Sequence, residues 1–309
     1  MSTLPLPSVG LTSRPVLPGV ARCPIGFVNV YFVGAPGSPW VLVDTGLPNT
    51  AGLVARAAEA RYGADARPEA IVLTHGHFDH SGGASALAER WDAPIYVHPM
   101  ELPFLTGRSA YPPPDVAAGG AMAFLARFFP SHGYDLRLDA RIRPLPDDGT
   151  VPGAEGWRWV HTPGHTPGHV SLFRDDDRLL VAGDALATMD LDAWSAQLTH
   201  ARRLARPPTP FTPDWDAAEA SVRRLADLLP WGIAAGHGRP LLGQEVAPTL
   251  QTFAQRFPAP SRGRYARVPA RFNPAGLVDV PPPVPDPVLP KLVAATACAT
   301  VLTRLIRRR

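Results

Sequence analysis

Cysteine and lysine are the scarcest chemically informative residues in this chain of 309 residues. The two cysteines, Cys23 and Cys298, lie at opposite ends of the sequence, which excludes a disulfide framework and a CxxC metal site. Any bound metal must therefore be held by histidine and carboxylate, and the chain has 10 histidines. Lysine occurs once, at Lys291, so arginine supplies nearly all the positive charge.

A strong charge of one sign is also missing. Charged residues make up 18% of the chain and the formal net charge is only +3, although the sequence pI is about 9.1. The arginines are dispersed until the terminal run 307–309. Nucleic-acid-binding proteins usually carry a dense basic surface, so this distribution makes a nucleic acid an unfavoured partner. The arginine excess is better explained by a compositional bias of the coding genome.

Long apolar runs are absent from the N-terminus, and residues 1–20 predict no signal peptide and a cytoplasmic protein. Residues 292–306 are largely apolar, but a spanning helix needs about 20 apolar residues. We expect a tail helix packed on the body or on a second subunit, which leaves a homo-oligomer open. A membrane-surface anchor with a basic flank is the less favoured alternative. The proline-rich stretch 281–290 predicts an extended connector, which divides the chain into 1–280 and 281–309.

Within residues 1–280, short β-rich runs alternate with helical stretches, which predicts an α/β fold. The expected strands are 28–33, 40–44, 70–74, 94–97, 157–161, 169–173, 178–182 and 232–235. Helices are expected over 50–62, ended by Gly63, and over 84–91. A third helix is expected to begin with Thr212 as N-cap and Pro213 as its first residue. Residues 100–146 and 186–211 are expected to be insertions, and the apolar run 121–129 is interpreted as core or subunit contact before a substrate lid.

Four ligand-type side chains follow the third of these strands within six residues. They are His75, His77, Asp79 and His80, in the segment THGHFDHSGG. On an irregular backbone His75 and His77 can face one metal while Asp79 and His80 turn toward a neighbouring one. Imidazole and carboxylate suit zinc, iron or manganese.

Further ligand-type residues follow later strands. His165 lies in the loop HTPGHTPGH, Asp184 follows the strand 178–182, and His237 follows the strand 232–235. Open α/β sheets gather their functional groups at strand ends, so these side chains are expected to meet the first four. Taken singly, each of them could equally be a structural histidine or a turn aspartate.

The order of these residues, with Asp44 before them, resembles the metallo-β-lactamase-fold hydrolase superfamily over roughly residues 25–245. The resemblance implies an α/β four-layer αββα sandwich with helical insertions, in which 1–280 is the hydrolase domain. It further implies that His75, His77 and His165 hold one metal ion and that Asp79, His80 and His237 hold a second. Asp184 would bridge the two ions, and Asp44 would orient a ligand.

Aspartate at position 184 is similar to the glyoxalase II and lactonase-like branches, whereas true β-lactamases of this fold typically have cysteine or serine there. The resemblance therefore implies two zinc ions per chain, with iron or manganese as alternatives. It also implies a hydroxide bridging the metals that attacks the carbonyl of a small ester, thioester or lactone. Asp79 and Asp184 are the catalytic candidates, and a small-molecule acyl compound is the expected partner.

Two other functions stay open at this point. One is a metal-dependent nuclease or phosphodiesterase of the same fold, and the other is an iron-dependent redox enzyme. The remaining histidines are interpreted as structural at positions 98, 161 and 169 and as surface residues at positions 132 and 200. Asn29 and Tyr111 are candidate substrate contacts that the sequence does not assign.

Overall fold

A seven-stranded sheet forms the first half of the fold in the computed structural model, which describes residues 13–129, 141–199 and 201–286. Its strands lie side by side in chain order, antiparallel from β1 to β4 and parallel from β4 to β7. They are β1 (Arg14–Leu17), β2 (Val20–Ile25), β3 (Val28–Val33), β4 (Val41–Val43), β5 (Ala70–Val72), β6 (Ile95–Val97) and β7 (Ile142–Pro144).

A second sheet has the order β12-β11-β10-β9-β8. Its strands pair antiparallel except for β10 and β11, which run parallel. A separate hairpin follows near the end of the described chain. The strands are β8 (Trp157–His161), β9 (Val170–Arg174), β10 (Leu179–Gly183), β11 (Gly232–Ala235) and β12 (Leu241–Leu242), with the hairpin of β13 (Arg271–Asn273) and β14 (Gly276–Asp279).

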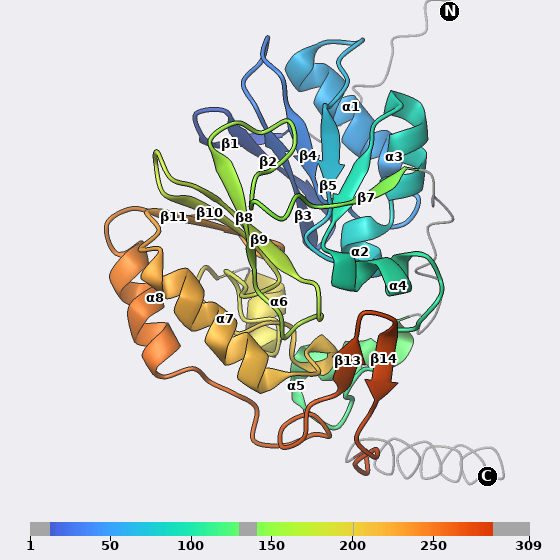
Figure 1. Ribbon diagram of the computed structural model, residues 1–309. Helices are drawn as coiled ribbons and strands as arrows, with labels where there is room; N and C mark the ends of the chain where they lie inside the picture. The colour runs from blue at the N-terminus through green and yellow to red at the C-terminus, as the bar shows by residue number, and fades with distance from the viewer. Residues whose placement is uncertain (1–12, 130–140, 200, 287–309) are drawn as a thin grey trace, which may run out of the picture.

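Helices pack outside the two sheets and in the segments that connect them (Figure 1). The α-helices are α1 (Ala51–Tyr62), α2 (Phe78–Ser81), α3 (Ala84–Trp91), α4 (Leu102–Leu105), α5 (Gly120–Leu125), α6 (Trp194–Thr199), α7 (Trp215–Asp227) and α8 (Val246–Gln255). The 3-10 helices are η1 (Pro99–Glu101), η2 (Ala126–Phe128) and η3 (Thr209–Phe211).

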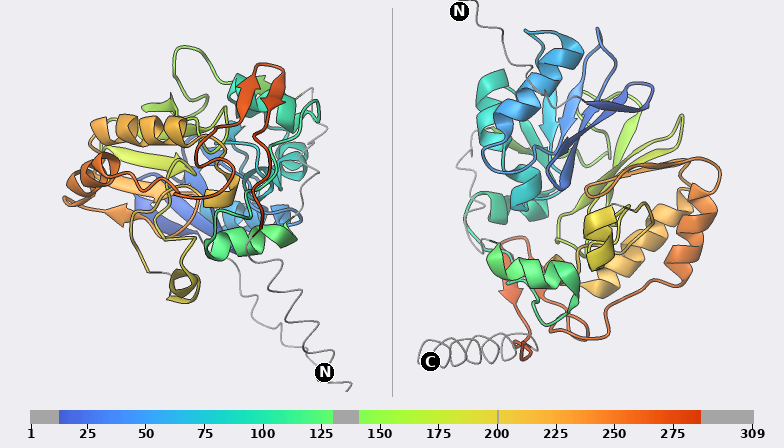
Figure 2. Two further views of the ribbon diagram at one scale, coloured as in Figure 1. Left: turned by 90° about the horizontal axis from the view of Figure 1, so that it is seen from below. Right: turned by 180° about the vertical axis from the view of Figure 1, so that it is seen from behind.

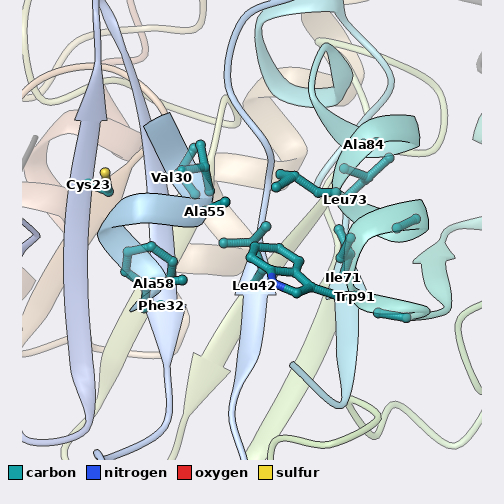
Figure 3. Close-up of a cluster of buried hydrophobic side chains, with 14 of the residues drawn as sticks. Cys23, Val30, Phe32, Leu42, Ala55, Ala58, Ile71, Leu73, Ala84 and Trp91 are labelled. Carbon is teal, nitrogen blue, oxygen red and sulfur yellow. The ribbon is translucent and has the colours of Figure 1, made fainter. Parts of the chain in front are cut away.

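The alternation of side chains along the strands separates the layers. In β4, Leu42 belongs to the core cluster that packs on α1 and α3, while Val41 and Val43 belong to the cluster between the two sheets. Figure 3 shows the first of these clusters, in which Leu42 and Ile71 lie near Trp91. Both faces of the sheet are therefore buried, which explains why β4 and β5 are apolar at every position.

A third core cluster joins the other face of the second sheet to α7 and α8. Leu180 and Ile233 contribute from the strands, and Val222 and Leu250 contribute from the helices. Figures 1 and 2 show α1 and α3 on one outer side and α7 and α8 on the other. The four-layer αββα sandwich is thus confirmed.

Several predicted boundaries are wrong. Helix α7 does not begin at Pro213; its N-cap is Asp214, whose carboxylate accepts a hydrogen bond from Ala217 N–H at 2.9 Å. Residues 100–146 are not wholly an insertion, because they include β7 of the main sheet. Arg178 precedes β10 with a positive φ of 56°, so this strand begins one residue later than expected. Helix α3 has the predicted extent, whereas α1 begins one residue later than predicted, with Thr50 as its N-cap, and Gly63 ends it with φ 103°.

Some predictions fall outside the described residues, namely those for His132, His200, Cys298 and the tail 292–306. No helix of the described ranges is long and apolar enough to cross a membrane. Part of the proline-rich connector is described, and its Asp286 pairs with Arg127 of η2 at 2.6 Å. The domain boundary near residue 280 stays a prediction.

Candidate metal centre

Three imidazole rings converge where β5 and β8 end. His75 and His77 lie on the irregular backbone after β5, and His165 lies on the loop between β8 and β9. His75 Nε2 and His77 Nδ1 are 3.1 Å apart, His77 Nδ1 and His165 Nε2 are 2.9 Å apart, and the third pair of atoms is 3.2 Å apart. All three side chains are buried. Three ring nitrogens that meet at one point form a group able to hold a metal ion.

A second group forms beside the first. Asp79 and His80 lie on α2, and His237 follows β11. Asp79 Oδ2 is 3.8 Å from His80 Nε2 and 3.5 Å from His237 Nε2. The single turn of α2 begins at Phe78, and the carbonyl of the preceding His77 accepts from His80 N–H at 2.9 Å. The prediction of a loop at these two positions is therefore wrong. The division of the four residues into two pairs stays a prediction, because the ligand atoms of His75, His80 and Asp184 also lie within 4.8 Å of one another.

Asp184 lies between the two groups, directly after β10. Its Oδ2 is 3.5 Å from His165 Nε2 and 3.1 Å from His237 Nε2, and its Oδ1 is 3.4 Å from His80 Nε2. One carboxylate thus reaches ligand-type atoms of both groups. The approach requires Gly236 nearby, because a Cβ there would collide with Asp184 Oδ1.

Two observations test whether this cluster fits metal ions. His80 Nε2 and Asp184 Oδ1 are buried and have no hydrogen-bond partner in the described part of the chain. Unpartnered buried polar atoms are costly and are rare in folded proteins. In the first group the nitrogen separations approach the ~3.3 Å expected for a tetrahedral ion bound at about 2.0–2.1 Å from each ligand. The donor set and the orphaned atoms therefore fit a metal-binding cluster.

Asp44 orients one of these ligand-type side chains. Its Oδ2 accepts from His80 Nδ1 at 2.8 Å, and its Oδ1 accepts from Thr74 N–H at 2.8 Å. With the proton on Nδ1, His80 presents the lone pair of Nε2 to the cluster. Asp44, which follows β4, has a positive φ of 60°, an uncommon backbone conformation for a residue other than glycine.

The other imidazoles have similar outer contacts. His237 Nδ1 donates to the carbonyl of Phe27 at 2.9 Å. His75 Nδ1 lies 3.1 Å from Thr74 Oγ1, and His165 Nδ1 lies 3.2 Å from Thr212 Oγ1. These contacts direct the Nε2 atom of each ring toward the cluster.

Burial and charge set the protonation of the cluster. Burial lowers the pKa of His77 to about 3 and lowers the pKa values of His75 and His165 well below 6.5, so the first group is neutral as metal ligation requires. In the second group burial also acts against the charged imidazolium. The carboxylates around His80 and His237, Asp184 above all, outweigh it and raise both pKa values.

Glu101 is a site residue that the sequence did not reveal. It is fully buried at the end of η1. Its Oε1 accepts from Gly168 N–H at 2.8 Å, and its Oε2 accepts from Gly76 N–H at 2.9 Å. Tyr111 O–H also donates to Oε2. One carboxylate therefore ties the loop of His75 and His77 to the loop of His165.

The other histidines of the described residues, at positions 98, 161 and 169, have mainly structural contacts, as predicted. His98 and His161 stack with ring centroids 4.1 Å apart, outside the cluster. His169 is buried behind it, where Nε2 accepts from Asp184 N–H at 2.8 Å. Asn29 donates to the carbonyls of Ala235 and Gly238 and thereby holds the segment that contains His237.

A cavity opens onto the cluster. It has a volume of about 20 Å³, which is room for roughly one water molecule. Aromatic rings surround the metal-ligand candidates at its mouth, and Phe129 stacks between Phe27 and Phe211. The run 121–129 thus serves two purposes, because Ala121 and Ala123 are buried while Met122 and Phe129 line the cavity.

Known proteins share this sequence pattern and fold. The sequence profile of the Metallo-beta-lactamase superfamily matches residues 23–237. A protein of Bacillus subtilis (strain 168), described as "Probable metallo-hydrolase YflN", is 43% identical over 242 residues, which are 77% of this chain and 90% of the relative. "Probable metallo-hydrolase YybB" of the same organism is 31% identical over 218 residues, or 71% and 84% of the two chains.

A solved structure supports the same fold. A B3 metallo-beta-lactamase with an active-site glutamic acid superimposes with a TM-score of 0.55 at 18% identity and covers 80% of this chain and 90% of its own. The matched segment 23–237 contains all of the clustered histidines and aspartates. The chain therefore belongs to the metallo-beta-lactamase superfamily and carries the buried His/Asp cluster of a candidate metallo-hydrolase.

Proposed function

We propose that the chain is a dinuclear metal-dependent hydrolase of small esters, thioesters or lactones, with zinc as its metal and iron or manganese as alternatives. The observation that carries this proposal is the position of Asp184, whose two oxygens reach both groups of ligand-type atoms. One carboxylate in contact with both ions would fix their separation. A site for a single ion would not need a second complete group of ligands.

The chain's own residues divide the work. His75, His77 and His165 would hold the first ion, and the group of Asp79, His80 and His237 would hold the second. When bound, two such ions lower the pKa of a water molecule toward about 7 and polarise an acyl carbonyl. No serine or cysteine nucleophile is then required.

Asp79 is the group best placed to orient the attacking water. It lines the cavity beside His77 and His165, and its Oδ2 lies 3.5 Å from His237 Nε2. A carboxylate oxygen there accepts a hydrogen bond from the attacking water molecule. This contact directs a lone pair of the water oxygen at the carbonyl carbon. The surrounding phenylalanine rings exclude bulk water and would contact the apolar part of an acyl group.

The identity of residue 184 bears on the substrate. Aspartate there is similar to the glyoxalase II and lactonase-like branches of the superfamily, so acyl esters, thioesters and lactones are proposed before β-lactams. A small-molecule acyl compound is the proposed partner, and a nucleic acid is not favoured.

The test is a substrate screen with protein of defined metal content. Metal-free protein and protein reloaded with zinc, manganese or iron are assayed on aryl esters, thioesters, lactones and phosphodiesters. We expect hydrolysis of acyl substrates that is lost on chelation and restored by metal. Turnover of phosphodiesters alone would favour the nuclease alternative. Tightly held iron without any hydrolysis would favour redox chemistry.

A further inference from the structure

A second cavity of about 530 Å³ lies next to the metal centre. The two cavities adjoin, because Phe27, Met122 and Phe129 line both of them. The smaller cavity at the cluster has room for roughly one water molecule, so it can take only the reacting end of a substrate. The volume of the larger one lies within the usual range of ligand sites, which is about 300–1,000 Å³.

Three arginines line the larger cavity: Arg14 on β1, Arg22 on β2 and Arg239, two residues after His237. Arg14 and Arg22 are direct cross-strand partners, an arrangement in which like charges destabilise a sheet. Burial, together with the nearby charges of Arg14 and Arg239, lowers the pKa of Arg22. The fold therefore concentrates positive charge at this wall at a cost in stability.

These charges are not neutralised by carboxylates of the described chain. Arg22 Nε donates to the amide oxygen of Asn29 at 2.6 Å, and none of the three guanidinium groups forms an ion pair within the described residues. Other arginines do pair with carboxylates, for example Arg174 with Asp177 and Arg158 with Asp175. The cavity wall thus presents unpaired guanidinium groups, which bind carboxylate and phosphate well.

Apart from Asn29 and Thr199, the rest of the cavity wall is apolar or glycine. Besides the residues shared with the metal centre, it contains Leu125, Met189 and Leu191. An apolar chain could therefore run from the cluster, past Phe27 and Phe129, to the arginines. A ligand that fits the metal cluster, the apolar wall and the arginines has a hydrolysable acyl end, an apolar middle and an anionic far end.

We infer that this cavity binds the distal carboxylate or phosphate of an acyl substrate, through Arg14, Arg22 and Arg239. The inference rests on the proposed function, since it assigns the substrate class of the same site. The arginines would act in binding and specificity and would have no part in bond cleavage. Arg239 lies two residues after His237, so one short segment carries both a metal-ligand candidate and an arginine of the cavity wall.

The test compares the binding of matched acids to the zinc-loaded protein by titration calorimetry. Succinate, adipate and suberate are compared with butanoate, hexanoate and octanoate, so that each pair differs only in the far carboxylate. Phosphonoalkanoates of the same lengths distinguish a preference for phosphate from one for carboxylate. The variants are Arg14→Met/Arg239→Met and, as a matched control, Arg143→Met, an exposed arginine on β7 at the opposite edge of the same sheet.

We expect the best diacid to bind at least about tenfold more tightly than its monoacid, because hydrogen bonds to charged groups are the stronger ones. The preference should fall severalfold in the double variant, in which Arg22 remains, and persist in Arg143→Met. Unchanged monoacid affinity in the double variant would show that it is folded. Equal binding of diacid and monoacid by the wild type, or a preference that the double substitution leaves undiminished, would overturn the inference.

Hydrolysis separates this inference from the proposed function. Mono-4-nitrophenyl adipate and 4-nitrophenyl hexanoate are offered to the same proteins. A diacid preference in binding without cleavage of either ester would support the cavity assignment and contradict the proposed reaction. Cleavage of both esters with equal kcat/KM, together with equal binding of the acids, would contradict the cavity assignment alone.

Discussion

Glu101 connects two loops whose side chains form the first group of ligand-type atoms. It accepts hydrogen bonds from the backbone of Gly76 and Gly168 and from the hydroxyl of Tyr111. Burial raises the pKa of this carboxyl group, while these donors lower it. The residue does not touch the reacting atoms, so we regard it as a positioning residue for His75, His77 and His165.

Replacing Glu101 with glutamine should weaken both the fold and the metal site. The amide offers one oxygen, so a backbone N–H would face the NH₂ group without an acceptor. We expect a loss of about 1–3 kcal/mol in the free energy of unfolding of the metal-free protein and a weaker zinc affinity. Chemical denaturation and zinc titration measure the two effects. Tyr111→Phe removes one donor only and should cost less; an unchanged zinc affinity in Glu101→Gln would contradict the positioning role.

His98 gives a pH-dependent prediction outside the metal cluster. Burial, and then the charge of neighbouring His161, lowers the pKa of His98 to about 4. The unfolded chain takes up this proton near pH 6.5, whereas the folded protein does so only near pH 4, so His98 makes stability fall as the pH drops through that window. NMR titration of the metal-bound protein should place the midpoint near 4. A midpoint at or above 6.5 would show that the ring is not shielded as the structure describes.

The ligand-type residues were predictable because each follows a strand end, and parallel neighbours end at the same edge of a sheet. Asp184 and His237 illustrate this, since β10 and β11 run parallel. Glu101 was not predictable, because its partners are backbone N–H groups of Gly76 and Gly168. Residue type and spacing contain no information about such pairings.

At the scale of elements, the start of α7 shows how a local signal can mislead. Thr212 followed by proline is a typical helix N-terminus. In the structure the Thr212 hydroxyl donates to Pro208 O at 2.9 Å and lies 3.2 Å from His165 Nδ1. Asp214 is therefore the N-cap of α7, and Thr212 contacts His165 instead of capping the helix.

Asp214→Ala should destabilise the protein by about 0.5–2 kcal/mol, the usual cost of losing an N-cap side chain. Thermal or urea unfolding measures the change. The control is Asp227→Ala, an exposed aspartate in the last turn of α7, which should change stability by less than about 0.5 kcal/mol. Equal effects of the two substitutions would show that Asp214 does not cap the helix.

At the scale of the whole molecule, the sandwich places the ends of both sheets at one edge, and each group of ligand-type residues combines side chains that follow strands of both sheets. His75 and His77 follow β5 of the first sheet, whereas Asp184 and His237 follow β10 and β11 of the second. The resemblance predicted these layers. The sequence pattern did not predict β7. This edge strand is short, and its isoleucine, arginine and proline show no strand periodicity.

Asp184 is proposed to join two metal sites in one cluster. The most direct measurement is the zinc content per chain, by elemental analysis, of wild type and Asp184→Ala after equilibration with zinc and removal of the excess. We predict about two zinc ions for the wild type and about one for Asp184→Ala, with hydrolysis lost in parallel. A wild type with one ion or none, or an active Asp184→Ala protein that retains two, would contradict the dinuclear account.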